Sequence, residues 1–309
     1  MMKNYITLKA NAKINLALNI INKREDGYHN LQTIMQTLLL HDNIFIKKIE
    51  TPIIKITSNL PWLPVDERNL VYKAISVFRR NYNIKEGIYV ELMKNIPVSA
   101  GLGGGSADCA ATLIGMRRLF NVKLSINEMM QIGKQLGADV PYLISQGTSL
   151  AKGIGDELTA LPPHPFVYVL LAKPKFSVST STAFKRIHNY PFVDKSVKIN
   201  TITLALAKKD IHTVAKNLFN DLEVVTATRY PVVNQIKEIM LLNGSIGALM
   251  SGSGPTVFGY FLNKRQAISA SKSLRSTVGI KEVILTGIFN RKKYTSKIRS
   301  KGVPHSFYH

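Results

Sequence analysis

The chain has 309 residues, of which 45% are apolar and 19% charged, a balance typical of a globular protein with a substantial core. Its 41 Lys and Arg against 19 Asp and Glu give a formal net charge of +22 at pH 7, which would attract an anionic substrate. No apolar run approaches the roughly 20 residues that cross a bilayer, and no signal-peptide core is visible. A single cysteine, Cys109, excludes an internal disulfide and has a packing role. We therefore expect a cytoplasmic protein without a membrane span.

The first segment alternates between apolar and polar residues. Every second residue from Ile6 to Ile20 is apolar, and most residues between them are polar. Alternation with period two predicts one bent strand or two strands. It puts Lys13 and Asn15 together on the face opposite the core. Such a face is ordinarily exposed to solvent, unless another motif supplies a partner.

The next predicted elements lead to the most informative stretch of the chain. Short strands are expected at 44–49 and 53–57, which are rich in β-branched residues. A helix is expected over 67–82, with apolar residues on one side. A strand over 88–92 then runs through Pro97 into a glycine-rich loop.

This loop, residues 97–107, reads Pro-Val-Ser-Ala-Gly-Leu-Gly-Gly-Gly-Ser-Ala and precedes a helix that should end near Asn121. Glycines 103–105 carry no Cβ, so backbone N–H groups can approach a polyphosphate closely. The helix beginning near Ser106 adds unpaired N–H groups and the positive end of its dipole. The spacing fits neither a Walker A loop nor the dinucleotide fingerprint. Alone, it predicts either a phosphate-binding loop or an ordinary strand-to-helix turn.

After the loop, Ser125 and Glu128 form a capping box for a helix that should stop at Gly137. A cluster of prolines at 162–165 marks a domain boundary between 155 and 165. The remaining predicted elements are strands at 148–152, 166–172, 246–250, 256–262 and 281–288 and helices at 182–189, 203–219 and 229–242.

Three units are expected: an N-terminal domain over 1–160, a C-terminal domain over 161–290 and a basic tail over 291–309. No acidic residue follows Glu282, and the tail is rich in Lys and Arg. We predict a solvated tail, with RNA contact as the alternative. No zinc-finger spacing, RNA-recognition motif or helix-turn-helix signal supports a nucleic-acid partner.

Five segments together resemble the GHMP kinase superfamily. They are Ala-Asn-Ala-Lys-Ile-Asn at 10–15, Asp-Gly-Tyr-His at 26–29, the glycine loop, Gly-Ala-Asp-Val-Pro at 137–141 and Met-Ser-Gly-Ser-Gly-Pro-Thr at 250–256. The resemblance extends to about residue 290. It implies an α+β fold of two lobes with the site in the cleft between them: an N-terminal α/β lobe with a left-handed crossover and a ferredoxin-like C-terminal lobe.

Within the superfamily, Asp-Gly-Tyr-His after the Ala-Lys-Ile-Asn strand resembles the family that phosphorylates the 2-hydroxyl of 4-(cytidine 5′-diphospho)-2-C-methyl-D-erythritol. The implied role is a step of non-mevalonate isoprenoid synthesis. The alternatives are another small-molecule kinase of the homoserine or mevalonate type, or a non-catalytic relative whose tail binds RNA. The expected partner is the small cytidyl substrate, and the chain would be a monomer or a homodimer.

The resemblance also assigns the reaction centre. Asp139 would accept the proton of the attacking hydroxyl, and Lys13 would keep Asp139 ionised and stabilise charge on the phosphoryl group. Taken alone, Asp139 is as well explained as a helix N-cap. ATP is the implied donor, with Mg²⁺ on its phosphates and Ser106 as the one candidate metal contact. The implied ATP-binding residues are Pro97, Val98, Ser99, Ala100, Gly101, Leu102, Gly103, Gly104, Gly105, Ser106 and Ala107.

The substrate is assigned by the same resemblance. Tyr28 would stack on the cytosine, His29 would hydrogen-bond to it and Asn15 would contact the erythritol end. Thr180 and Phe184 are candidates to complete the nucleotide pocket. Ala107 departs from the pattern, because many relatives carry a hydroxyl residue there. The turn expected either to close the site or to serve as a structural hairpin consists of Ser251, Gly252, Ser253 and Gly254.

Overall fold

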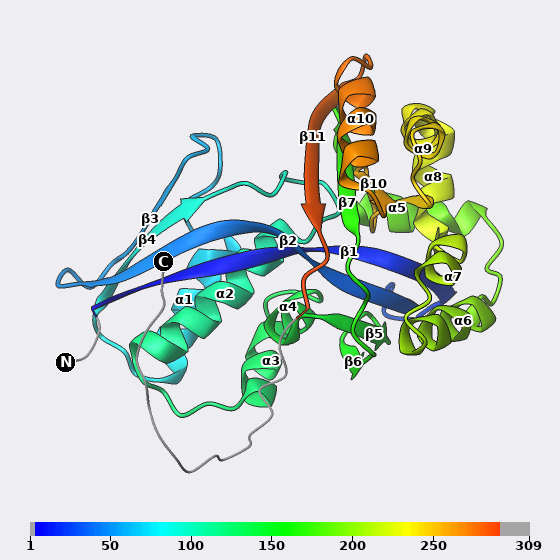
Figure 1. Ribbon diagram of the computed structural model, residues 1–309. Coiled ribbons are helices and arrows are strands. Elements are labelled where there is room, and N and C mark those ends of the chain that lie inside the picture. The colour runs from blue at the N-terminus through cyan, green and yellow to red at the C-terminus, as the bar shows by residue number, and fades with distance from the viewer. Residues whose placement is uncertain (1–3, 291–309) are drawn as a thin grey trace, which may run out of the picture.

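The computed structural model describes residues 4–290; residues 1–3 and the predicted basic tail, 291–309, lie outside the described residues. Two long strands, β1 and β2, run across the whole molecule (Figure 1). Helices α1–α4 gather on one side of these strands, and α8–α10 stand with a second sheet on the other. The molecule is therefore organised around one central pair of strands.

The first sheet has seven strands in the order β3-β4-β2-β1-β8, with β5 and β6 continuing from β2. β1 and β2 pair antiparallel from Tyr5 opposite Lys47 to Lys23 opposite His29, and the register shifts on both sides of Lys13 and Asn15. Such bulges bend a strand, so the alternating segment forms one bent strand. The strands are β1 (Tyr5–Lys23), β2 (His29–Ile49), β3 (Ile54–Ser58), β4 (Gly87–Met93), β5 (Thr148–Lys152), β6 (Glu157–Ala160) and β8 (Phe219–Asn220).

The helices of the N-terminal half pack on this sheet through small residues. A Cβ on Gly115 would lie 2.6 Å from Cδ1 of Ile46 and 2.7 Å from Cδ1 of Leu8, so α2 lies closest to β1 and β2 where glycine leaves out the side chain. Burial raises the pKa of the neighbouring Cys109 thiol to about 12, which agrees with its predicted packing role. The predicted capping box of Ser125 and Glu128 is confirmed. The helices are α1 (Leu70–Asn81), α2 (Gly104–Leu119), α3 (Ile126–Lys134) and α4 (Val140–Ser145).

The second sheet has four antiparallel strands in the order β11-β7-β10-β9. Helices connect β7 to β9 and β10 to β11, which is the βαββαβ topology of a ferredoxin-like unit. The expected α+β class and the ferredoxin-like unit are thus confirmed. The elements are β7 (Tyr168–Pro174), β9 (Gly247–Met250), β10 (Val257–Phe261), β11 (Ile280–Gly287), α5 (Thr180–Arg186), the 3₁₀ turn Ile187–Asn189, α6 (Ser196–Ala207), α7 (Ile211–Lys216), α8 (Asp221–Arg229), α9 (Val232–Leu242) and α10 (Lys264–Arg275).

The predicted elements differ most from the structure in three places. The single helix expected over 203–219 is α6, α7 and β8, because Asp210 caps a new helix by accepting a hydrogen bond from the backbone N–H of Thr213. Residues 221–229 form α8, a separate helix capped by Asn220. β2 begins at His29 rather than at residue 44, since most of its first half is buried on both faces and shows no alternation.

Residues from the second half of the chain complete the first sheet. β8 pairs in parallel with β1 at Ala17 and Leu18. Just beyond β11 of the second sheet, the N–H of Phe289 donates to the carbonyl of Thr37 on β2 at 2.9 Å, next to a bridge between Leu38 and Ile288, and this contact links the two sheets. Residues assigned by sequence to the C-terminal domain thus complete the first sheet, and the division at residue 160 stays a prediction.

Candidate active site

A cavity of about 790 Å³ opens where β1, the glycine loop, the start of α4 and the turn after β9 meet. Separate parts of the sequence thus supply its walls, although their motifs lie far apart along the chain. The predicted site residues that line it are Lys13, Asn15, Pro97, Val98, Ser99, Ala100, Gly101, Leu102, Gly103, Gly104, Gly105, Ser106, Asp139, Thr180, Phe184, Gly252, Ser253 and Gly254.

Lys13 and Asp139 form an ion pair at one wall of this cavity. The Nζ of Lys13 lies 3.4 Å from Oδ2 of Asp139 and donates to Oδ1 of Asn15 at 2.7 Å. Lys13 is 5% exposed, whereas the Asp139 side chain is 35% exposed and open to the cavity. Asp139 precedes α4, yet among the described residues its side chain makes no capping hydrogen bond. Asp139 thus occupies the N-cap position predicted for it, but its side chain faces the cavity and does not cap the helix. The expectation of a solvent-exposed face around Lys13 is wrong.

Three residues of the glycine loop have left-handed backbone conformations: Ser99 with φ +53°, Gly101 with φ +76° and Gly103 with φ +70°. A Cβ on Gly101 would lie 2.2 Å from the carbonyl oxygen of Ser251, and one on Gly103 would lie 3.0 Å from Cγ of Lys13. The backbone N–H of Lys13 donates to the carbonyl of Leu102 at 3.0 Å. The loop is thus confined between β1 and the turn after β9, and α2 begins directly behind it.

The helix start behind the loop has the features that suit an anion. The first turn of α2 consists of Gly104, Gly105 and Ser106, all of which line the cavity. The first N–H groups of a helix have no partner within the helix, and the helix dipole is positive at this end. An anionic group placed here would meet backbone donors and the ammonium of Lys13.

The turn after β9 forms a further wall of the cavity, next to Asn15 and the glycine loop. Ser251 is fully buried and its Oγ donates to the carbonyl of Gly101 at 2.9 Å, so this residue joins the turn to the glycine loop and does not line the cavity. Asn220 Nδ2 donates to the carbonyls of Met250 and Gly252. The Oγ atoms of Ser253 and Thr180 lie 3.0 Å apart, which links the turn to the start of α5.

The Asp-Gly-Tyr-His motif lies beside the cavity rather than in its wall. Tyr28 is 62% exposed and His29 is 6% exposed, and neither lines the cavity. The ring of His29 lies 5.2 Å from that of Phe184, which does line it, and 4.9 Å from that of His188. Burial and the nearby His188 and Lys23 lower the pKa of His29. Its Nε2 is buried and has no hydrogen-bond partner within residues 4–290.

Sequence reasoning missed several residues of the wall. Lys94 and Asp108 line the cavity, and Asp42 binds Lys94 from behind. The position of Lys94, just before the glycine loop, was the one available signal, because the contacts come from separate elements. Ala107 was predicted to contact ATP, but it is buried and does not line the cavity.

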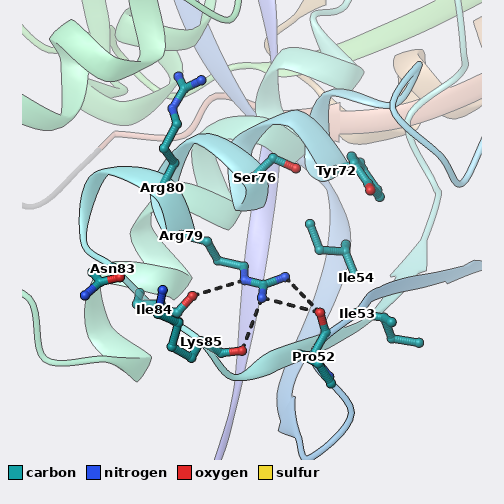
Figure 2. Close-up of a pocket in the computed structure, with 10 residues that line it drawn as sticks. All are labelled: Pro52, Ile53, Ile54, Tyr72, Ser76, Arg79, Arg80, Asn83, Ile84 and Lys85. Carbon is teal, nitrogen blue, oxygen red and sulfur yellow. Dashed lines mark hydrogen bonds between the residues drawn. The ribbon is translucent and has the colours of Figure 1, made fainter.

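A second hollow, of about 970 Å³, lies at the outer edge between β3 and α1. Figure 2 shows Arg79 reaching across it to the carbonyls of Pro52, Ile84 and Lys85, while Arg80 points away. None of the predicted site residues lines it. This hollow is larger than the cavity around Lys13, but the guanidinium at its centre, that of Arg79, already donates its hydrogen bonds to backbone carbonyls. We therefore assign the chemistry to the cavity around Lys13.

The described residues 4–290 contain no group of three His, Cys, Asp or Glu side chains suited to a metal ion. Within that same part of the chain, no helix has the length and apolar character needed to span a membrane. Near the glycine loop, oxygen atoms that could contact a cation include those of the Asp139 carboxylate and the Ser106 hydroxyl.

Comparisons with known proteins agree with this geometry. Residues 69–147 match the model of the GHMP kinases N terminal domain, and residues 202–280 match GHMP kinases C terminal. The chain is 45% identical over 284 residues to the 4-diphosphocytidyl-2-C-methyl-D-erythritol kinase of Lachnospira eligens, covering 92% of this chain and 98% of the relative. It is 44% identical over 279 residues to the enzyme of the same name from Caldicellulosiruptor saccharolyticus, covering 90% and 95%.

Solved structures give the same picture of the fold. A crystal structure of a 4-(cytidine 5′-diphospho)-2C-methyl-D-erythritol kinase superposes with a TM-score of 0.76 at 27% identity, covering 92% of this chain and 99% of that one. A homoserine kinase from Cytophaga hutchinsonii superposes with a TM-score of 0.75 at 20% identity, covering 93% and 95%. The second likeness concerns the fold alone.

Proposed function

Since this chain belongs to the GHMP kinases, and within them to the family of 4-diphosphocytidyl-2-C-methyl-D-erythritol kinases, we propose that it phosphorylates the 2-hydroxyl of 4-(cytidine 5′-diphospho)-2-C-methyl-D-erythritol with ATP. The observation that carries the proposal is the contact of 3.4 Å between Lys13 and Asp139 beside the glycine loop. A carboxylate, an ammonium group and a backbone anion site then face one cavity, which is what phosphoryl transfer requires.

The phosphoryl group is proposed to be transferred in one step. The substrate oxygen attacks the γ-phosphorus, its proton passes to Oδ2 of Asp139, and the bond between γ-phosphorus and the bridging oxygen breaks to release ADP. Lys13 stabilises the negative charge on the transferred group, and its hydrogen bond to Asn15 orients the ammonium. The glycine loop and the first turn of α2 would hold the β- and γ-phosphates through their N–H groups.

The donor set also fits Mg²⁺ arriving with ATP. Mg²⁺ usually keeps several waters and is held by one or two protein oxygens together with substrate phosphates, and Asp139 and Ser106 supply such oxygens at the cavity. When bound, the ion neutralises charge on the phosphates. The rest of the site relies on the protein's own donors.

We assign the cytidine to the end of the cavity at Phe184. His29 lies against this ring with a buried nitrogen that lacks a partner in the described chain, as expected of a group that awaits a ligand. Tyr28, next to it and exposed, is proposed to cover the base when substrate binds. Thr180 and the turn at 252–254 would close the wall toward the substrate diphosphate.

ADP release from purified protein, given Mg·ATP and the cytidyl substrate, tests the proposal. We expect turnover that requires the cytidine group and falls about 10²–10⁴-fold in Asp139→Asn. Activity on homoserine or mevalonate instead would transfer the proposal to that substrate class. Inactivity on every substrate, with salt-dependent RNA binding, would favour the non-catalytic alternative. Cytoplasmic location and a monomeric or homodimeric state stay predictions.

A further inference from the structure

Three buried charges lie directly behind the glycine loop and take no part in the proposed chemistry. Lys94, the first residue after β4, places Nζ 2.6 Å from Oδ2 of Asp108 and also pairs with Asp42. The three side chains are between 0% and 4% exposed. Burying charge is costly unless the groups are paired and hydrogen-bonded, so the cluster demands a structural or functional reason.

Each charge belongs to a different element, and together they surround the entrance to the loop. Asp42 lies on β2, Lys94 leaves β4 and Asp108 lies on α2. Oδ1 of Asp42 also accepts hydrogen bonds from the N–H groups of Asn95, at 2.5 Å, and Ile96, at 2.8 Å. One carboxylate therefore holds three consecutive residues of the chain as it enters the loop.

The main chain of Lys94 is fixed as well. Its N–H donates to Oδ1 of Asn59 at 2.8 Å, and Nδ2 of Asn59 donates to its carbonyl at 3.1 Å. Asn59 follows β3, so a fourth segment takes part. Neither the backbone nor the ammonium of Lys94 can move without breaking several hydrogen bonds.

We infer that Lys94 is a positioning residue, which ties the start of the glycine loop to α2 through Asp108 and to the sheet through Asp42, and so sets the geometry in which the loop binds ATP. Lys94 and Asp108 both line the cavity, and a Cβ on Gly104 would lie 3.4 Å from Nζ of Lys94. A site made of backbone N–H groups has no side chains that could adjust, so its affinity depends on where the backbone is held. The inference rests on the proposed use of this loop for ATP.

The charges of Asp42, Lys94 and Asp108 indicate which substitutions of Asp108 are informative. Two carboxylates share one ammonium, and burial, followed by the nearby Asp42, raises the pKa of Asp108 well above its usual value although Lys94 opposes the shift. Asp108→Ala would remove the link to α2 and leave the neutral pair of Lys94 and Asp42 intact. Asp108→Asn would keep an oxygen for Lys94 in nearly the same shape.

The test is calorimetric binding of Mg·ATP without the second substrate, beside binding of the cytidyl substrate alone. We expect Asp108→Ala to raise the Kd for Mg·ATP about tenfold or more, the size of a lost hydrogen bond between charged groups. Asp108→Asn should raise it less than a third as much, and the Kd for the cytidyl substrate should stay constant. Amide exchange should quicken over 97–106 but not along β1.

A matched control is Asp210→Ala, which removes the cap of α7 and weakens the fold at a residue that does not line the cavity. The inference is overturned if Asp108→Ala leaves the Kd for Mg·ATP unchanged, if both ligands weaken equally, or if Asp108→Asn is as impaired as Asp108→Ala. Should Asp108→Ala not fold, Asn59→Ala decides, with a rise of about threefold supporting the inference and no rise overturning it. Failure of the proposed function would appear in the wild-type protein itself.

Discussion

The two ends of the active-site cavity are built by different means. At the phosphate end, backbone groups and buried charges are held by hydrogen bonds from β1, β4, α2 and the turn after β9, as at Lys13, Leu102 and Ser251. At the end near Phe184, aromatic rings meet without hydrogen bonds between them, and His29 keeps an unpaired nitrogen. The first end is preorganised, whereas the second is completed when a ligand arrives.

The difference follows from the chemistry that each end must perform. Charge that develops on a phosphoryl group is stabilised best by dipoles that do not have to reorient. A planar base, in contrast, can be held by stacking, which tolerates small shifts of a ring. Substitutions at the phosphate end should therefore change the rate, and those at the aromatic end should change the affinity for the cytidyl substrate.

The largest effect is expected for Lys13→Met. Loss of the ammonium removes a charge that acts on the transferred group, and kcat should fall about 10²–10³-fold with little change in the KM for the cytidyl substrate. Steady-state kinetics measure this. Lys9→Met, on the exposed part of the same strand, is the matched control and should retain full activity. A Lys13 variant with more than a tenth of the wild-type kcat would contradict the proposed role.

The second-largest effect is expected for Gly101→Ala. The added Cβ meets the carbonyl of Ser251 and strains a residue at φ +76°, so the loop must shift, and kcat/KM should fall about 10–100-fold. Gly147→Ala has the same strain at φ +83° but open space around it. It should lose stability without losing catalytic efficiency in the same assay. Equal kinetic losses in the two variants would show that the contact with the turn is unimportant.

At the aromatic end, Phe184→Ala should raise the KM for the cytidyl substrate about 5–100-fold, since stacking of a base on an aromatic ring contributes about 1–3 kcal/mol. The Kd for Mg·ATP, measured by calorimetry, should not change. Tyr28→Ala should have a smaller effect on the same KM, because its exposed ring must first be ordered. If Phe184→Ala lowers kcat and leaves KM unaltered, the contrast between the two ends is wrong.

Acid pH acts on the stability of the whole fold rather than on either end of the cavity. Burial lowers the pKa of His164 to about 4; its Nδ1–H donates to the carbonyl of Pro165 and its Nε2 accepts from the hydroxyl of Tyr260. The unfolded chain binds this proton near pH 6.5, so stability is present above that pH and is lost as the pH falls toward 4. Between pH 7 and 5 the loss should be about 2 kcal/mol.

Urea unfolding at pH 7 and pH 5 measures this loss of stability, and the loss should be smaller in His164→Gln. The variant also serves the comparison of the two ends, because it separates the loss of stability at acid pH from any effect on the KM for the cytidyl substrate. Protonation of His29 at the aromatic end could contribute to such an effect, although the lowered pKa of this ring opposes it in the fold. A wild-type stability that is the same at both pH values would refute the assignment.

Most of the site residues that were predicted from the sequence and that line the cavity lie in short sequence motifs. Lys13, the glycine loop and Asp139 each lie in a local pattern, and the structure brings them to one cavity. The cluster of Asp42, Lys94 and Asp108 escaped prediction, because its members come from three elements and resemble ordinary surface charges. The same holds for the stacking of His188 on His29, which depends on how α5 and the following turn pack against the start of β2.

Local propensity also failed where tertiary structure decided the outcome. Phe219–Asn220 reads as the end of a helix, yet it forms a strand because β1 offers a free edge at Ala17 and Leu18. The polar face of β1 reads as solvent-exposed, yet the glycine loop and the turn at 252–254 cover it. In both cases, the deciding partner lies far away along the chain.

The pairing of β8 with β1 also limits when the protein can fold during its synthesis on the ribosome. The edge of β1 at Ala17 has no partner until Phe219 has been made, and the carbonyl oxygen of Thr37 has none until Phe289 has been made. At about 5–20 residues per second, the ribosome needs roughly 10–40 s to make the stretch between Ala17 and Phe219. The nascent chain therefore carries the glycine loop and Asp139 for many seconds before the turn at 252–254 exists, so the cavity proposed to bind ATP is complete only after residue 254 has been made.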